Sequence, residues 1–189
     1  AMMELNGRVA AWYQEQLHSE AGAAALEYAR GLFGDDEPER ATMGYAPRSG
    51  DARYRWARAT GESLELLEEL HLIARNKEQG TFYDFMRDRL VYPIRDARRN
   101  VIGFTARDLS GQSPAKYVNS AESEVYHKAR SIYGYEPFVN GEAMRKEQYI
   151  LVEGAADAVK MHSVGVLNVV APLGGSWTDE QFAILRKHA

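Results

Sequence analysis

Residues 89–107 read RLVYPIRDARRNVIGFTAR, and this stretch decides the fold of the middle of the chain. Two runs rich in β-branched, aromatic and other apolar residues, 89–95 and 101–107, flank a five-residue break, DARRN. Runs of this kind, joined by a short break, predict a β-hairpin. Pro93 has no backbone N–H to donate, so we expect the first strand to lie at a sheet edge or to carry a bulge.

Helices are expected on both sides of this hairpin. Apolar residues recur at helical spacing over 9–13 and again over 23–29. Residues 63–70 predict a shorter amphipathic helix, and Ser63 is placed to cap its first turn. After the hairpin, residues 136–148 predict one more helix.

The sequence from residue 148 onward alternates between strand and helix patterns. We expect a buried strand over 148–152, a helix over 155–162, a strand over 166–171 and a final helix that begins within 176–180. This order predicts a parallel pair of strands joined by a right-handed crossover. Two strands cannot make a parallel sheet that is covered on both faces, so we expect the beginning of a larger α/β fold.

The composition of the chain limits the classes of protein to consider. Its 189 residues are 45% hydrophobic and 26% charged, as in folded globular proteins. No apolar run approaches the roughly 18 residues of a membrane span, so we expect no membrane partner. The absence of cysteine excludes disulfides, thiolate zinc sites and thiol catalysis. It also fits a reducing compartment, and we expect a cytoplasmic protein with no zinc site in this chain.

The net charge of −4 hides an uneven distribution. Residues 75–130 contain eleven Lys and Arg against seven Asp and Glu, whereas the rest of the chain contains twelve against twenty. A basic segment in an acidic body indicates a surface for an anionic partner. A charged face that is merely solvated gives the same balance, so charge alone does not distinguish it from a binding surface.

One candidate site is acidic. Glu153 and Gly154 follow the strand predicted over 148–152, and ligands of open α/β sheets gather at the carboxyl ends of strands. Asp157 lies one helical turn later on the same side. Two carboxylates at this spacing can hold a divalent cation such as Mg²⁺ with further ligands from elsewhere, although an acidic residue near a helix start is also common for structural reasons.

A second candidate site is basic and aromatic, in a segment rich in Ser and Gly. Basic side chains bind phosphates, Asn can position a base, and Tyr offers a stacking face. The segment contains Arg107, Lys116, Tyr117, Asn119, Lys128 and Arg130. The hairpin could extend this face through Arg87, Arg89, Arg95, Arg98 and Arg99. The alternative is that these cations bind loop carbonyls and neighbouring acids.

A series of short motifs runs in a fixed order through the chain. They are RDRLVYPIRD at 87–96, VIGF at 101–104, PAKYVNS at 114–120, YHK at 126–128, IYG at 132–134 and ILVEG at 150–154. From residue 44 to the C-terminus, this series resembles the catalytic core of bacterial (DnaG-type) DNA primases.

The resemblance implies an α+β fold. A helical and β-hairpin amino-terminal subdomain that binds template would span residues 4–147, and residues 148–189 would form the first β-α-β-α part of an α/β Toprim fold. The implied function is the synthesis of short RNA primers on single-stranded DNA from ribonucleoside triphosphates.

The resemblance also assigns residues. Glu153 maps onto the catalytic Toprim glutamate and, with Asp157, onto the site for Mg²⁺ or Mn²⁺. The residues that map onto the ridge for template and nucleotide phosphates are Arg89, Arg107, Lys116, Tyr117, Asn119 and Lys128. The implied macromolecular partners are single-stranded DNA and a replicative helicase, the latter contacted through a domain outside this chain.

The sequence departs from the family pattern in several places. Ala155 and Ala156 stand where the family usually has an aromatic residue and a methionine, and Thr105 and Ala106 replace a frequent glycine pair. The family's metal site needs a later Asp-x-Asp, and no such triplet occurs in the sequence. We therefore expect a fragment of a longer primase that is inactive alone.

Two other classes of protein stay open. One is a single-strand-binding module that keeps the basic ridge and has lost catalysis, and the other is a Toprim protein of recombination or a topoisomerase. An intact Asp-x-Asp further along the gene would indicate a primase, and its loss would indicate the binding module. The PAKYVNS motif before the Toprim strand is not expected in the second.

Overall fold

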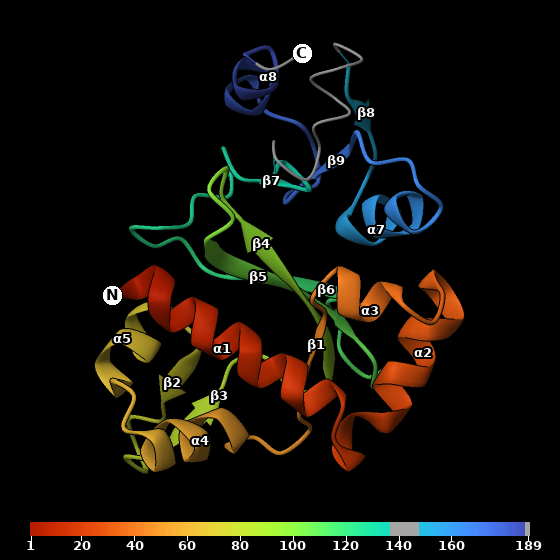
Figure 1. Ribbon diagram of the computed structural model, residues 1–189. Coiled ribbons are helices and arrows are strands. Elements are labelled where there is room, and N and C mark those ends of the chain that lie inside the picture. The colour runs from red at the N-terminus through yellow and green to blue at the C-terminus, as the bar shows by residue number, and fades with distance from the viewer. Residues whose placement is uncertain (137–147, 188–189) are drawn as a thin grey trace.

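The computed structural model describes residues 1–136 and 148–187. The helix expected over 136–148 lies, apart from its two end residues, outside the described residues. The described part contains three sheets with helices packed around them (Figure 1). The central sheet is antiparallel in the order β1-β4-β5-β6, from β1 (Gly44–Ala46), β4 (Arg89–Arg95), β5 (Val101–Asp108) and β6 (Tyr117–Asn119).

The predicted hairpin is the pair β4 and β5, and both of its faces are buried. On one face, Val91, Phe104 and Ala106 pack against α1 (Met2–Leu17), where the rings of Tyr13 and Phe104 meet edge to face with centroids 5.4 Å apart. The other face packs against α2 (Ala23–Phe33) and α7 (Ala155–Ser163). The hairpin is therefore the centre of the fold, as the run of apolar residues predicts.

Pro93 lies in a strand that was expected to be at a sheet edge or to carry a bulge, and β4 meets this expectation only around the proline. β4 lies between β1 and β5, but β1 pairs only with residues 89–91. At Pro93, β5 is the one neighbouring strand among the described residues, so the proline lies on a locally unpaired edge of β4. The register also shifts between Ile94 and Arg95, which is the bulge that the sequence suggested.

The helices and strands before the hairpin include several that the sequence did not indicate. The expected helix over 63–70 is α5 (Leu64–Glu69), and the Ser63 hydroxyl accepts a hydrogen bond from the Leu66 amide at 3.1 Å. Gly44 of β1 is required because an added Cβ would lie 2.4 Å from the Cβ of Tyr13 on α1. The remaining elements are η1 (Glu20–Gly22), α3 (Glu37–Arg40), α4 (Ala52–Thr60), β2 (Ile73–Arg75) and β3 (Phe82–Asp84).

The last part of the chain forms the third sheet. β8 (Ile150–Leu151) and β9 (Val169–Pro172) are parallel and joined through α7, as predicted, and α8 (Asp179–Leu185) follows. The sequence did not indicate β7 (Ile132–Tyr133), which pairs antiparallel with β9 and comes from before residue 147. Figure 1 shows this sheet above the central one, with α7 beside it.

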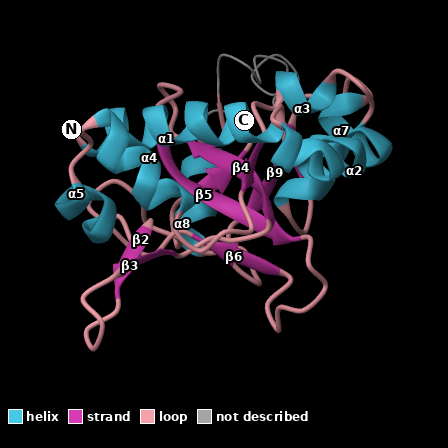
Figure 2. Ribbon diagram, turned by 90° about the horizontal axis from the view of Figure 1, so that it is seen from below, coloured by secondary structure: helices cyan, strands magenta, loops and turns pink. Residues whose placement is uncertain are grey.

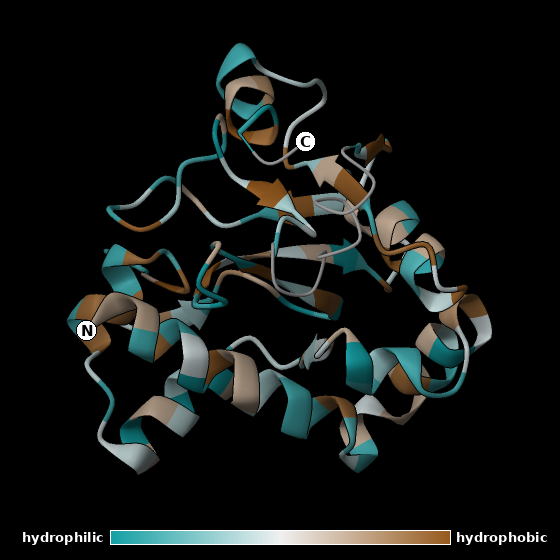
Figure 3. Cartoon of the chain, turned by 45° about the horizontal axis from the view of Figure 1, so that its top comes forward, coloured by the Kyte–Doolittle hydropathy of each residue, from teal (hydrophilic) through white to brown (hydrophobic). Residues whose placement is uncertain are grey.

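The expectation of a buried strand at 148–152 is wrong. Ile150 is 37% exposed and Leu151 is 42% exposed. Among the described residues β8 pairs only with β9, the strand against which α7 packs, so the side chains of β8 stay largely uncovered. The hydropathy colouring in Figure 3 shows apolar residues along the strands of the sheets. Within the described ranges, no helix is long and apolar enough to cross a membrane.

Candidate functional site

A cavity of about 430 Å³ lies where β5 and β6 meet the start of α7 and the loop after β9. Seven of the eight residues that the family resemblance assigns line it: Arg107, Lys116, Tyr117, Asn119, Lys128, Glu153 and Asp157. Arg130, the other cation predicted for the basic site, does not line it. The structure therefore merges the basic and acidic sites into one. Arg89 is the exception among the eight.

Arg107 is held by aromatic rings on the wall of the cavity. Its guanidinium carbon lies 5.3 Å from the ring centroid of Tyr28 on α2 and 5.9 Å from that of Tyr117 on β6. Its Nη1 also donates a hydrogen bond to the Tyr117 hydroxyl at 3.4 Å. Burial raises the pKa of Tyr117 above its ordinary value, although Arg107 opposes the shift, so the phenol is neutral at pH 7. Arg107 is a fixed, stacked cation rather than a mobile one.

Arg89 does not face the cavity. It is 7% exposed, and its Nη2 donates a hydrogen bond to the Ser113 hydroxyl at 2.7 Å. Its two terminal nitrogens also donate to the Ala115 carbonyl oxygen, each at 3.2 Å. Burial lowers its pKa. The side chain therefore holds the loop that carries Lys116 and does not line the cavity.

The loop of Lys128 is held from two sides. The Lys128 amide donates to Oε1 of Glu122 at 2.8 Å. From the start of α8, Nε2 of Gln181 donates to the Ser131 carbonyl at 2.8 Å, and Gln181 is 1% exposed. The Lys128 side chain passes Gly174, where an added Cβ would lie 3.4 Å from its Cε. Both lysines of the cavity are exposed at their tips and stand on anchored loops.

Asn119 connects the two halves of the site. Its side-chain Nδ2 donates a short hydrogen bond to the carbonyl oxygen of Leu173, in the loop after β9. This donor is therefore occupied by the protein. Asn119 fixes the position of β6 against the floor of the cavity, next to Glu153 and Gly154.

The acidic side of the cavity contains two carboxylates. Oδ2 of Asp157 accepts a hydrogen bond from the Gly154 amide at 3.1 Å, so this residue caps its own helix. Glu153 is exposed and has no hydrogen bond or ion pair to any described residue. The described residues contain no group of three or more His, Cys, Asp or Glu that could hold a metal ion. The carboxylates suit Mg²⁺ in kind, but they supply few of its six ligands.

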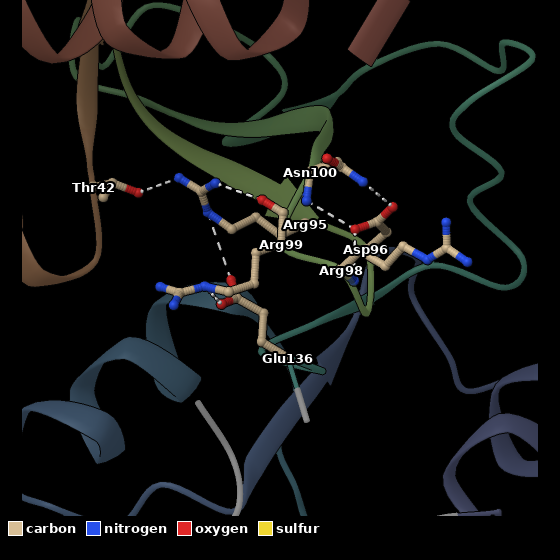
Figure 4. A network of polar contacts seen from close by, with 7 residues as sticks. All are labelled: Thr42, Arg95, Asp96, Arg98, Arg99, Asn100 and Glu136. Carbon is tan, nitrogen blue, oxygen red and sulfur yellow. Dashed lines mark hydrogen bonds and ion pairs between the residues drawn. The ribbon is translucent and has the colours of Figure 1, made fainter. Parts of the chain in front are cut away.

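The arginines of the hairpin turn do not extend this face, contrary to the expectation from the sequence. Arg95 lies six residues along β4 from Arg89, which is about 20 Å at 3.3 Å per residue. Figure 4 shows that Arg95 and Arg99 turn toward Glu136 and Thr42. The ion pairs to Glu136 are 3.6 Å and 3.3 Å long, and Nη2 of Arg95 donates to the Thr42 hydroxyl at 3.0 Å. These arginines stabilise the structure at the far end of the hairpin.

Sequence reasoning missed some residues of the site. Tyr28 stacks on Arg107 from a helix far away in the chain, and no pattern in the sequence indicates that contact. The backbone of 172–175 forms the floor of the cavity. Thr178 and Gln181 form a capping box, which the sequence does indicate, but its second role of holding residues 128–131 depends on the tertiary fold.

Comparison with known proteins relates this geometry to a family. The family model "DNA primase catalytic core, N-terminal domain" matches residues 12–138. The DNA primase of Haemophilus influenzae is 35% identical over 185 residues, which are 97% of this chain and 30% of that protein. The DNA primase of Staphylococcus aureus (strain COL) is 31% identical over 190 residues, which are 98% of this chain and 31% of that protein. This chain thus spans about 30% of the length of the curated relatives it matches.

Solved structures agree with the sequence relatives. The RNA polymerase domain of Mycobacterium tuberculosis primase DnaG, in complex with a double-stranded DNA oligomer with a 6-nucleotide overhang, matches with a TM-score of 0.90 and 30% identity. The match covers 98% of this chain and 58% of that one. A DnaG primase catalytic domain bound to single-stranded DNA matches with a TM-score of 0.80 and 31% identity over 99% of this chain and 60% of that one. The expected α+β class is confirmed, and the chain belongs to the DNA primase family and contains the N-terminal domain of its catalytic core.

Proposed function

We propose that this chain is the part of a DNA primase that holds the template strand and the incoming ribonucleotide during synthesis of short RNA primers. The observation that carries the proposal is the single cavity in which Arg107, Lys116 and Lys128 face Glu153 and Asp157. Cations opposite carboxylates suit phosphoryl transfer, in which positioning and charge stabilisation supply most of the catalysis. Residues 4–147 serve as the template-binding subdomain, and residues 148–189 begin a Toprim fold.

Each side chain of the cavity has a distinct task in this proposal. Lys116 and Lys128 bind phosphates as mobile point charges on anchored loops. Arg107 presents a fixed guanidinium, and Tyr117 beside it offers a ring face for a base. Asn119 keeps the strand carrying Tyr117 in place against the acidic side of the cavity. Arg89, predicted from the sequence to bind nucleic acid, instead positions the Lys116 loop.

The proposal includes a divalent cation, Mg²⁺ or Mn²⁺. Glu153 and Asp157 would hold it, and the cation would supply positive charge against the oxygens of the transferring phosphate. Glu153 is the residue we assign to catalysis because its carboxylate is free, whereas one oxygen of Asp157 caps a helix. A replicative helicase and a cytoplasmic location belong to the same proposal for the whole primase.

The direct test is single-stranded DNA binding by a Lys116→Ala/Lys128→Ala double variant. Each lost phosphate contact lowers the slope of log affinity against log salt by about 0.7, so the slope should fall by about 1.4. Lys77→Ala/Lys187→Ala is a control with the same change in charge, because both lysines are exposed and neither lines the cavity. A double variant that stays folded and binds like the control would show that the cavity is not the DNA site.

A binding module without catalysis is the second candidate, favoured by one observation. Among the described residues, the cavity is lined by three cations, Arg107, Lys116 and Lys128, but by only two carboxylates. Both candidates predict DNA binding. Primer synthesis from ribonucleotides by the whole protein, lost in Glu153→Gln, would separate the primase from the binding module.

A further inference from the structure

A second cavity, of about 410 Å³, lies on the other side of Arg107. We call it the α2 groove. It is lined by Ala21, Ala24, Ala25, Tyr28, Tyr45, Asp88, Arg107, Asp108, Leu109 and Gly111. Arg107 lines both the α2 groove and the cavity that holds Lys116 and Lys128, so the two spaces adjoin at this side chain. Figure 1 shows α2 beside the central sheet, on the side where the labels of β1 and β6 lie.

The walls of the α2 groove suit a flat aromatic group. Alanine side chains of α2 leave room on one side, and Leu109 adds apolar surface. Tyr28, with Arg107 stacked on its ring, provides a rigid aromatic edge. Stacking on tyrosine and arginine is the usual way in which proteins hold bases of single-stranded nucleic acid.

Asp88 gives the α2 groove an oriented hydrogen-bond acceptor. Its Oδ1 accepts a hydrogen bond from the Tyr45 hydroxyl at 2.9 Å. Burial and this hydrogen bond raise the pKa of Tyr45 to about 12, so the phenol is a permanent donor that fixes the carboxylate. Oδ2 of Asp88 accepts no hydrogen bond from the described residues. The nearest cation, Nε of Arg48, lies 3.9 Å away on a side chain that is 86% exposed.

The carboxylates that line the α2 groove favour a base over a phosphate group as its ligand. Asp88 and Asp108 both line it, and two carboxylates repel a phosphate group. Asp108 is already occupied, since its oxygens accept from the Ser110 hydroxyl and the Gly111 amide, each at 2.8 Å. Oδ2 of Asp88, whose one printed contact is the 3.9 Å ion pair to exposed Arg48, is left to accept a hydrogen bond from a ligand, and an amine on a base is a suitable donor.

We propose that the α2 groove binds a base of single-stranded DNA whose backbone lies along Arg107 and the neighbouring cavity. Asp88 selects bases with an exocyclic amine, so cytosine, which presents N4–H₂, is preferred over thymine, which presents the O4 acceptor at the same position. This inference rests on the proposed function, because it assigns a template base to the strand that the cavity holds.

The test compares the affinities of the full 189-residue chain for fluorescent oligo-dC and oligo-dT of about twelve nucleotides. We expect oligo-dC to bind about fivefold more tightly, as one amine–carboxylate hydrogen bond allows. In Asp88→Asn, Tyr45 keeps the amide oxygen and the amide nitrogen takes the place of Oδ2. The preference should then disappear or reverse toward oligo-dT. Asp88 has a φ of 49°, which asparagine tolerates well, so the backbone is preserved.

A second variant tests the space itself. Ala24→Leu should fill the α2 groove and weaken binding of both oligonucleotides, whereas Ala23→Leu is the matched control on the same helix, exposed and outside the groove. Equal affinity of these two variants, or a preference for oligo-dC that survives Asp88→Asn, would overturn the groove assignment. If either result came together with weak DNA binding by Lys116→Ala/Lys128→Ala, the groove assignment would be wrong while the proposed function would still hold. A chain that binds neither oligonucleotide contradicts both proposals.

Discussion

The guanidinium of Arg89 donates a hydrogen bond from each terminal nitrogen to the carbonyl oxygen of Ala115, and both bonds are 3.2 Å long. Lys116 is the next residue, so a buried cation sets the position of an exposed one. The loop of Lys128 is built similarly, with Gln181 as the buried side chain. We therefore expect the affinity of the proposed site to depend on residues that do not line its cavity.

Arg89→Met should lower single-stranded DNA affinity by about threefold and leave the salt slope unchanged, because no phosphate contact is lost. The free energy of unfolding should fall by about 1–3 kcal/mol, since loop carbonyls lose their donors. Fluorescence anisotropy over a range of salt concentrations, together with urea unfolding, measures both. Arg87→Met removes the same charge from an exposed position and serves as the control. A slope reduced by about 0.7 would mean that Arg89 contacts phosphate after all.

Gln181→Glu should loosen the loop of Lys128. The variant keeps an oxygen for the Thr178 amide, which donates to Oε1 at 3.0 Å, but it removes the donor to Ser131. We expect a loss of about 1–3 kcal/mol in stability and faster amide hydrogen exchange at residues 128–131. Glu180→Gln, at an exposed neighbouring position, is the control. Unchanged exchange in a folded Gln181→Glu variant would show that the contact does not hold the loop.

Mg²⁺ should bind the 189-residue chain only weakly, with no dissociation constant below about 1 mM. Glu153 and Asp157 leave most of the octahedral shell to water, and Mg²⁺ dehydrates reluctantly. Isothermal titration calorimetry with Mg²⁺ or Mn²⁺ measures this. A tight stoichiometric site that is lost in Glu153→Gln would mean that the described carboxylates suffice for metal binding.

Glu136→Gln should change the pH dependence of stability. Burial raises the pKa of Glu136 above its ordinary value of 4.5, although Arg95 and Arg99 oppose the shift. A carboxyl group with a raised pKa binds more protons in the folded chain than in the unfolded one. Its contribution to the free energy of unfolding is therefore present at low pH and is lost as the pH rises past 4.5 toward the raised pKa. The stability advantage of the parent chain over Glu136→Gln should therefore shrink with rising pH across this window.

Urea unfolding of both chains at a series of pH values gives the difference directly. Glu124→Gln, an exposed carboxyl substitution, sets the background. A difference that grows with pH would show that the ion pairs with Arg95 and Arg99 outweigh burial.

The sequence was most informative where long runs of one period occur. The hairpin of β4 and β5, the crossover from β8 through α7 to β9 and the Ser63 cap were all predicted correctly. Strands of three residues, such as β1 and β6, are too short to show a period, and long-range pairing creates them. The expected burial of β8 was wrong because apolar composition does not reveal which neighbours cover a strand.

The candidate site shows the same division. Residue types and spacing identified seven of the residues that line the cavity. They could not separate Arg89, which binds the protein's own carbonyls, from Lys116, which is exposed, because both are cations in a basic segment. Burial decides that distinction, and it is a property of the fold.

The pairing of β7 with β9 places Ile132 opposite Pro172 and Tyr133 opposite Ala171. These two residues of β7 are 3% and 7% exposed, so their burial depends on a strand that follows them by nearly forty positions. We therefore expect the two modules that the sequence predicts to meet at residue 147 to unfold as one cooperative unit. Heating should melt residues on both sides of that point in one transition, since α7, which follows it, also packs against α2, which precedes it (Figure 2 shows the two helices side by side). A shortened chain that ends at residue 147 would expose an apolar strand and unfold at lower temperature.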